Sequence, residues 1–301
     1  MFGRGATVAE PVVVLRRPAR SPAMDTARKV LRAPLAAPCL VIILIFAVCA
    51  VLAPVLAPYS PTEQLPSEAL QTPNGSHLLG TDNLGRDMLS RMMYGARVSL
   101  GISFGAVALG ILVGVTLGLV AGYLRGIADE VIMRIMEMII AFPGLIFALA
   151  LVSTLGPSVR NLLIAIGIAG VPGLARLVRS QVLTVRERDY VLAARTLGAT
   201  GPRVLFRHIW PNCMAPVIVA ATLGMGFAVL AEAGLSFLGV GVRPPTPTWG
   251  SMLQFSFGFL SIAPYLSIVP GVAIFLLVLS FNLLGDALRD ALDPSLRGTG
   301  R

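Results

Sequence analysis

Few residues of this chain are of the types that carry out catalysis or bind metal ions. The cysteines Cys39, Cys49 and Cys213 form no C-x-x-C pair, and two of them lie in one apolar run. The only histidines, His77 and His208, are too few and too far apart for a zinc site. The sequence also lacks a P-loop, so this chain should not hydrolyse ATP itself. We therefore predict no catalytic centre, no metal site and no bound cofactor.

One ionisable residue, Glu232, lies well inside an apolar run near 214–240 that is long enough to cross a membrane. A carboxylate at that depth is costly unless it is paired or faces water, so Glu232 is a candidate for a transport pathway. The alternative is a structural hydrogen bond at the packed outer end of the helix. The sequence leaves both interpretations open.

A basic segment, residues 176–212, separates two of the apolar runs. It contains seven arginines and two acidic residues: Arg176, Arg179, Arg186, Arg188, Arg195, Arg203, Arg207, Glu187 and Asp189. One predicted helical face carries small or apolar residues at the spacing i, i+3, i+4, i+7: Tyr190, Ala193, Ala194 and Leu197. Gly198 should end this helix, Pro202 suits the first turn of a second helix, and Pro211 should end that second helix. Periodicity favours equally a helix pair on the lipid surface and one that docks into a soluble partner.

Membrane-spanning helices must position these residues. Of the 301 residues, 55% are hydrophobic and only 13% are charged, about half the charge of a soluble protein. The mean hydropathy is +0.81. Apolar runs predict an all-α membrane protein with six spans, near 37–56, 98–124, 133–155, 161–177, 214–240 and 265–284. The net charge of +9 accompanies no nucleic-acid-binding motif, so we expect no nucleic acid partner.

The second predicted span carries glycines at strict four-residue spacing: Gly110, Gly114, Gly118 and Gly122. Four-residue spacing places them on one helix face, where a neighbouring helix can approach closely. We expect a role in helix packing.

The distribution of basic residues predicts that both chain ends lie in the cytoplasm. Nineteen of the 24 Lys and Arg residues fall in the two tails, the turn at 125–134 and the basic segment, as the positive-inside rule requires of cytoplasmic parts. The predicted layout is a disordered cytoplasmic tail (1–34), a first transmembrane helix (35–57), an extracytoplasmic loop (58–97), a core of spans (98–285, with a coupling loop at 178–212) and a cytoplasmic tail (286–301). A cleaved signal peptide is the alternative at the N-terminus, but the apolar run is long for one.

The extracytoplasmic loop contains a polar string that runs from His77 to Arg91. Thr81 or Asp82 could cap a helix that leads into the next span. Further along, Trp249 is expected to anchor the chain at the membrane interface.

Three stretches resemble a known family. Ala193-Ala194-x3-Gly198, followed by FRHIWPN at 206–212, resembles the "EAA" loop of permease subunits of binding-protein-dependent ABC importers. GTDNLGRD at 80–87 with the SRMMYGARVSL that follows, and EAGLSFLGVG at 232–241, resemble the C-type subunit of the dipeptide and oligopeptide branch. The likeness extends over about residues 38–290. One departure is Leu192, where the family usually has the glutamate that precedes the two alanines.

The resemblance implies a type I ABC importer permease fold, in which the EAA loop forms coupling helices that sit in a cleft of the ATPase subunit. It implies that the following residues make the coupling contacts: Arg188, Asp189, Tyr190, Ala193, Ala194, Arg195, Gly198, Arg203, Phe206, Arg207 and His208. The implied partners are a second homologous permease subunit, two cytoplasmic ATPase subunits that hold ATP and Mg²⁺, and an extracytoplasmic substrate-binding protein. The implied location is the bacterial inner membrane.

Two alternatives to a peptide importer remain. The same fold in this branch also carries nickel chelates, glutathione or other small solutes. A self-contained secondary transporter would instead need paired intramembrane charges or broken helices in matching halves, and Glu232 has no evident partner in the sequence.

Overall fold

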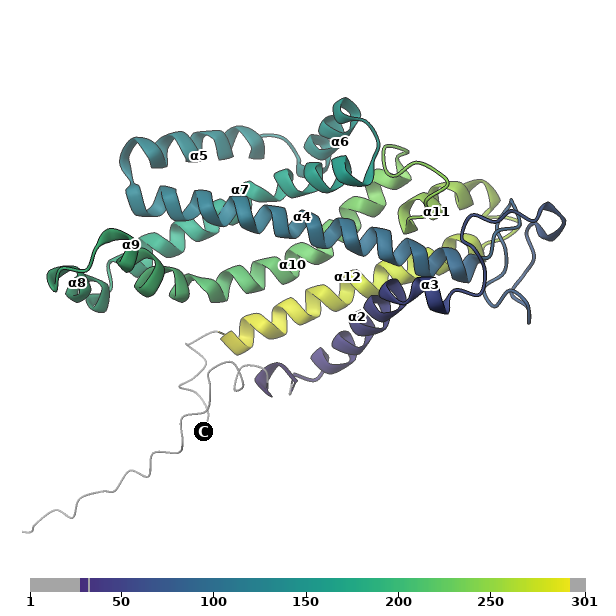
Figure 1. The fold of residues 1–301 in the computed structure, drawn as a ribbon, viewed down its shortest axis with the longest axis horizontal. Coiled ribbons are helices and arrows are strands. Elements are labelled where there is room, and N and C mark those ends of the chain that lie inside the picture. The colour runs from purple at the N-terminus through teal and green to yellow at the C-terminus, as the bar shows by residue number, and fades with distance from the viewer. Residues whose placement is uncertain (1–27, 32, 293–301) are drawn as a thin grey trace, which may run out of the picture.

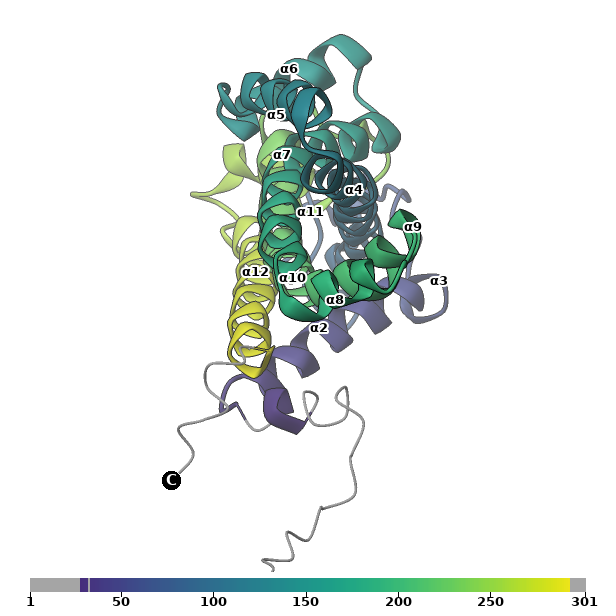
Figure 2. The ribbon, with the colours of Figure 1, turned by 90° about the vertical axis from the view of Figure 1, so that its left-hand side faces the viewer.

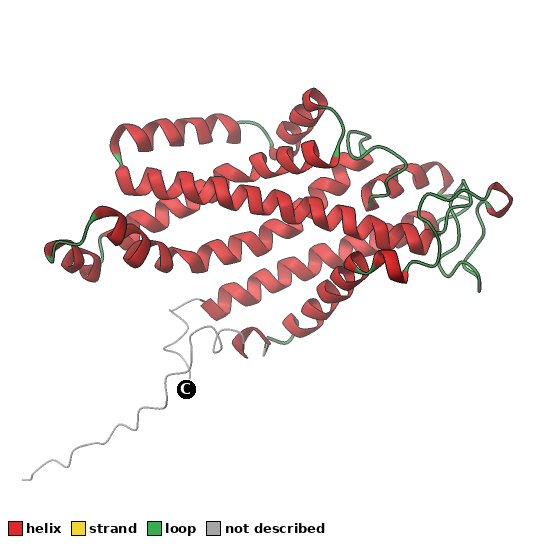
Figure 3. Ribbon diagram, viewed as in Figure 1, coloured by secondary structure: helices red, strands yellow, loops and turns green. Residues whose placement is uncertain are grey.

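The computed structural model describes residues 28–31 and 33–292. Within these residues the fold is helical and contains no strand, only an isolated bridge between Thr81 and Asp87, and Figure 3 shows helices joined by turns and longer loops. Nearly all of the predicted tail 1–34, and the tail beyond residue 292, lie outside the described part.

Four helices are long and apolar enough to cross a membrane, and they lie alongside one another (Figure 1). They are α4 (Met88–Leu124), α7 (Val159–Arg186), α10 (Trp210–Phe237) and α12 (Tyr265–Leu292). Before them, α2 (Ala36–Val51) is apolar but shorter, and the four-residue helix α3 (Ala53–Leu56) extends it. The chain is therefore a multi-pass membrane protein.

The predicted third span at 133–155 is not one straight helix. Two helices, α5 (Gly126–Ile140) and α6 (Gly144–Leu155), replace it and meet at an angle of 88°. Pro143 lies at the break, and a proline disfavours the helical conformation in the residue before it. By length and composition the described residues hold four spans, or five if this bent pair counts as one, against the six predicted.

The glycine stripe of α4 faces α7. A Cβ added to Gly118 would lie 2.6 Å from the backbone oxygen of Ala175, and one added to Gly122 would lie 2.8 Å from Cβ of Val182. Gly114 is equally tight, whereas Gly110 has room for a methyl group at 3.5 Å from its nearest neighbour. Three of the four glycines thus let two long helices touch at backbone distance, and α4 and α7 form the most extensive helix pair of the structure.

The long helices run between two ends that differ in character. At the first, which we call the loop end, lie the irregular segment 57–87 with η1 (Pro66–Glu68), α11 (Trp249–Ser256) and η3 (Phe257–Phe259). At the second, the α8–α9 end, lie α8 (Asp189–Thr196), α9 (Gly201–Val204) and the π-helical segment η2 (Leu205–Ile209). Figure 1 shows the two ends at opposite extremes of the molecule, and Figure 2 looks onto the α8–α9 end.

At the loop end a helix leads into the second predicted span, as expected, but the residues predicted to cap it are wrong. Helix α4 begins at Met88, well before the predicted span at 98, and its cap is Asp87, whose carboxylate accepts a hydrogen bond from the Ser90 amide at 2.7 Å. Neither Thr81 nor Asp82 caps this helix. Asp82 instead binds backbone amides of its own loop and the Arg86 side chain.

Trp249 does not sit at a lipid surface. It is fully buried, its indole nitrogen donates to the Met92 carbonyl at 3.0 Å, and its ring packs edge-on against Phe46. It therefore joins α11 to α4 and α2, and the interfacial position predicted for it is wrong.

Candidate functional site

The predicted coupling segment forms two short helices, but its boundaries differ from the prediction. Its N-terminal part to Arg186 belongs to α7, so the segment between the long helices is 187–209. Gly198 has a φ of +82°, which glycine adopts at little cost, and it follows the end of α8. Pro202 lies in the first turn of α9.

Pro211 does not end the second helix. It lies just after the π-helical turn η2, and the chain continues as helix through α9, η2 and α10. The second half of the segment, α9 and η2, thus runs into the long apolar helix α10 without a non-helical break. A π-helical turn such as η2 is often found at functional sites.

Three buried residues anchor the segment to the long helices. Val191 of α8, Val204 of α9 and Ile209 of η2 are at most 1% exposed. They share an apolar cluster with α4, α7 and α10 residues that include Val178 and Cys213. The segment is therefore a packed structure and not a loose loop.

The outer side of the segment is apolar and basic at once. Leu197 is 88% exposed and Phe206 is 63% exposed, although both are large apolar residues. Nine of the predicted coupling residues are exposed here: Arg188, Asp189, Tyr190, Ala193, Arg195, Gly198, Arg203, Phe206 and Arg207. The other two, Ala194 and His208, are half-buried. Leu192, at the position where the family has glutamate, is exposed on α8.

Sequence analysis missed the residues that join this segment to α4. The Tyr123 hydroxyl donates to the Gly201 carbonyl at 3.0 Å, and the Arg195 guanidinium lies 6.0 Å from the centre of the Tyr123 ring. Arg186 donates from one nitrogen to the carbonyls of Gly122 and Tyr123 at 3.3 and 3.4 Å, where the end of α4 leaves carbonyls without helical partners. A tyrosine at the end of a span is the one signal that the sequence offered.

Two ion pairs tie α5 to the same region. Arg179 of α7 binds Asp129 of α5 through two parallel bonds of 2.5 and 2.6 Å. Arg125, at the turn between α4 and α5, lies 3.2 Å from Glu187. The first pair is partly buried and bidentate, which is the stronger arrangement, whereas the second is exposed.

Glu232 is fully buried in α10, near the loop end. Its Oε1 accepts a hydrogen bond from Ser236 at 2.8 Å, and the hydroxyl groups of Ser99 and Thr248 also face its carboxyl group. Its Oε2 has no partner by strict geometry among the described residues. This arrangement joins α10 to α4 and to the start of α11, as the structural interpretation of Glu232 requires.

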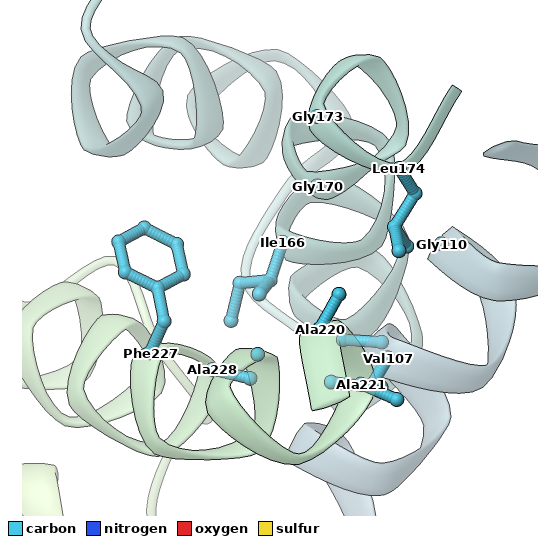
Figure 4. Close-up of a pocket in the computed structure, with 12 residues that line it drawn as sticks. Val107, Gly110, Ile166, Gly170, Gly173, Leu174, Ala220, Ala221, Phe227 and Ala228 are labelled. Atoms are coloured by element: carbon cyan, nitrogen blue, oxygen red, sulfur yellow. The ribbon is translucent and has the colours of Figure 1, made fainter. Parts of the chain in front are cut away.

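An open cavity of about 240 Å³ lies between α4, α7 and α10 (Figure 4). Glycine and alanine residues form most of its wall, and the larger side chains of Ile166, Leu174 and Phe227 border it. Glu232 is not one of the lining residues, and none of them is charged. The walls offer a small apolar solute or side chain space without a charged partner.

A buried histidine lies at the loop end. His77 contacts Asp87 through Nδ1 at 2.9 Å and Glu68 through Nε2 at 3.0 Å, and Tyr59 stacks on its ring at 4.8 Å. Burial alone would lower the pKa of His77. The hydrogen bonds to Asp87 and Glu68, with their charges, outweigh burial, so its pKa is raised above its usual value. The protonated ring can donate to both carboxylates and so holds the loop to the cap of α4.

Comparison with known families assigns the chain. Residues 114–298 match the family described as the inner membrane component of binding-protein-dependent transport systems. Residues 21–73 match the N-terminal transmembrane domain of oligopeptide transport permease C. The chain belongs to this family of transport permeases and, within it, to the C-type branch.

Individual relatives with similar sequences are also transport system permease proteins. The dipeptide transport system permease protein DppC of Alkalihalophilus pseudofirmus is 48% identical over 78% of this chain and 77% of its own. The di/tripeptide transport system permease protein DppC of Pseudomonas aeruginosa is 46% identical, over 79% and 81%. The glutathione transport system permease protein GsiD of Pectobacterium atrosepticum is 45% identical, over 75% of each chain.

A solved structure gives the fold. The MetNI methionine ABC transporter, in an inward-facing conformation, contains a chain that matches with a TM-score of 0.57 at 17% identity. The match covers 68% of this chain and 98% of that one. The part of this chain that the match covers thus has the fold of an ABC transporter permease.

Proposed function

We propose that this chain is one permease subunit of an ATP-driven importer of dipeptides and oligopeptides in a bacterial inner membrane. It would form half of the pathway, with a second homologous permease as the other half. Six spans, with α2 and α3 as the first and α5–α6 as the third, would place both chain ends and the α8–α9 end in the cytoplasm. The loop end would then face an extracytoplasmic substrate-binding protein.

The observation that carries this proposal is the outer side of the α8–α9 end. Leu197 and Phe206 expose large apolar surfaces beside four arginines, on a segment that is packed firmly at its base. With the α8–α9 end in the cytoplasm, as proposed above, these apolar side chains would face water and would mark a docking surface. Two cytoplasmic ATPase subunits, which would hold ATP and Mg²⁺, fit this role.

Each predicted coupling residue takes a part in this proposal. Ala193, Ala194 and Gly198 have small side chains or none, so that α8 could fit closely into a cleft of the ATPase subunit. Tyr190, Leu197 and Phe206 would supply apolar contacts with it. Arg188, Arg195, Arg203 and Arg207 supply charge to meet acidic groups of the ATPase. Gly198 is also needed for its backbone conformation, because its φ of +82° is strained for a residue with a Cβ, although a Cβ there would meet nothing within 4 Å in this chain.

The transport step would be alternating access. Closure of the ATPases on ATP would move α8 and α9, and the long helices would follow and open the cavity between α4, α7 and α10 to the other side. Glu232 would reach a cargo only in a conformation that uncovers it, so we place it in helix packing first and in the pathway second.

Glutathione is a second candidate cargo. The relatives at 45–48% identity include both dipeptide and glutathione permeases, and glutathione is itself a modified tripeptide. The uncharged walls of the cavity favour neither. In a shared pathway of this kind, a separate binding protein would select the solute.

The test is purification of this chain from its native membrane in mild detergent, followed by identification of the co-purifying proteins and by transport in liposomes. A second permease and P-loop ATPases, with ATP-dependent uptake of a labelled dipeptide through the binding protein, are the expected result. Recovery of the chain alone, still moving solute without ATP, would replace the proposal with a self-contained carrier. Uptake of glutathione but not of dipeptide would change the cargo only.

A further inference from the structure

We infer that Tyr123, at the end of α4, is the positioning residue through which movement of α8 and α9, the docking helices, reaches α4. This inference rests on the proposed function and deepens it. It concerns the route by which movement of α8 and α9 reaches α4, and it assigns that route to one side chain and its contacts.

The starting point is a difference in connection. Helix α10 is covalently continuous with α9 through η2, so any movement of α9 moves α10 directly. Helix α7 is also joined closely to the docking helices, since only two residues separate its end at Arg186 from the start of α8 at Asp189. Helix α4 has no such continuity, because residues 125–188 lie between its end and α8. It can follow only through noncovalent contacts.

Tyr123 makes contacts of two kinds with the docking helices. Its hydroxyl donates to the Gly201 carbonyl at the first residue of α9, and its ring carries the Arg195 guanidinium from the last turn of α8. Gly201 lies so close that a Cβ added there would be 3.0 Å from the Tyr123 oxygen. One side chain thus touches both helices, directly on either side of the bend at Gly198.

Arg186 completes the connection from α7. It donates to the carbonyls of Gly122 and Tyr123, which fixes the end of α4 against the end of α7. Beside it, the α4 glycines at 118 and 122 touch α7 at backbone distance. A displacement of Tyr123 should therefore move α4 and α7 together, because close-packed helices shift as a unit.

The contacts around Arg186 offer a second arrangement. Its buried Nε makes no hydrogen bond among the described residues, although the Glu187 carboxylate lies 3.5 Å away. That carboxylate also faces Arg125, at 3.2 Å. A small movement of Glu187 toward Arg186 would satisfy the buried donor and release Arg125, and this would be the second arrangement that coupling through the junction needs.

The test uses the intact complex in proteoliposomes with its binding protein, and measures uptake of labelled Ala-Ala dipeptide per ATP hydrolysed. Tyr123→Phe removes the hydrogen bond to Gly201 but keeps the ring beneath Arg195. We expect uptake per ATP to fall at least about fivefold, with ATPases still bound and ATP still hydrolysed. Tyr94→Phe, which removes a hydroxyl nearer the other end of α4, is the matched control and should leave the ratio unchanged.

Arg186 provides a second variant with a conservative rescue. Arg186→Gln should lower the ratio in the same direction, and Arg186→Lys, which keeps a cation able to donate to the two carbonyls, should restore part of it. A purely structural role would lower the amount of assembled complex and leave the ratio of the surviving complexes intact.

The outcomes separate the two claims. If the unmodified complex imports dipeptide with ATP and Tyr123→Phe has the same ratio, this inference is overturned and the proposed function stands. If Tyr123→Phe loses its ATPases, the residue serves docking and not transmission, and the inference is again overturned. If the unmodified complex shows no ATP-dependent uptake, the proposed function fails and takes this inference with it.

Discussion

The two ends of the long helices differ in which kinds of side chain they bury and which they expose. At the loop end, charged and aromatic residues are buried and paired within this chain, as for His77 between two carboxylates and Trp249 against Met92. At the α8–α9 end, large apolar residues such as Leu197 face outward and only the base of the segment is packed. The difference indicates that the loop end is held together by buried polar and aromatic contacts of its own, whereas the exposed apolar side chains of the α8–α9 end are the surface that the proposed docking would cover.

A first test of this contrast removes the largest buried side chain of the loop end. Trp249→Ala should destabilise the chain by about 3–5 kcal/mol, because it deletes a fully buried ring and its hydrogen bond to Met92. The measurement is thermal unfolding in detergent, or the yield of monodisperse protein. A variant as stable as the parent would mean that the loop end is not a self-sufficient core.

A second test concerns the helix pair that links the two ends. Gly118→Val should cost about 1–3 kcal/mol or more, because its side chain would meet α7 backbone at 2.6 Å. Gly110→Ala is the matched control, since the nearest atom to its new methyl group lies at 3.5 Å. Equal unfolding temperatures for the two variants would contradict the close approach of α4 and α7.

A third test uses pH to sharpen the description of the loop end. The pKa of His77 is raised in the folded chain, so its contribution is complete below its ordinary value of about 6.5 and is lost as the pH rises through the folded value. His77→Gln should therefore lower stability by about 1 kcal/mol near pH 6 and by less near pH 9. Proteolysis of the 57–87 segment at both pH values measures this. A loss that does not depend on pH would argue against a protonated His77.

The smallest effect on stability is expected at the α8–α9 end. Leu197→Ser should change the free energy of unfolding by no more than about 0.5 kcal/mol, because this side chain is 88% exposed. The same variant should weaken binding of the ATPases, measured by the amount retained on the purified complex. Val191→Ser, six residues earlier and buried, is the control that should reduce stability. Strong destabilisation by Leu197→Ser would show that the surface is not free.

Local chemistry predicted much of this structure. The glycine stripe of α4, the end of α8 before Gly198 and the start of α9 near Pro202 all depend on backbone rules that act over a few residues. Those same rules misjudged Pro211, because the helix continues through this proline directly after the π-helical turn η2, which the local rules did not predict.

Contacts between residues far apart in the chain could not be predicted from the sequence. The bond from Tyr123 joins residues separated by 78 positions, and Trp249 reaches an oxygen 157 positions away. The bend at Pro143 was visible as a proline, but hydrophobicity alone made the region resemble one span. Periodicity identifies which face of a helix is apolar and cannot identify what will cover it.

The continuity of α9, η2 and α10 has a mechanical consequence. Helical residues extend from Gly201 to Phe237, 37 in number, which at 1.5 Å per residue is a rod of about 55 Å. Tilting such a rod by about 5° about one end displaces the other end by about 5 Å, close to the pitch of one helical turn. A modest rotation imposed on a few exposed residues would thus be amplified into a displacement the size of an amino-acid side chain on the far side of the bilayer.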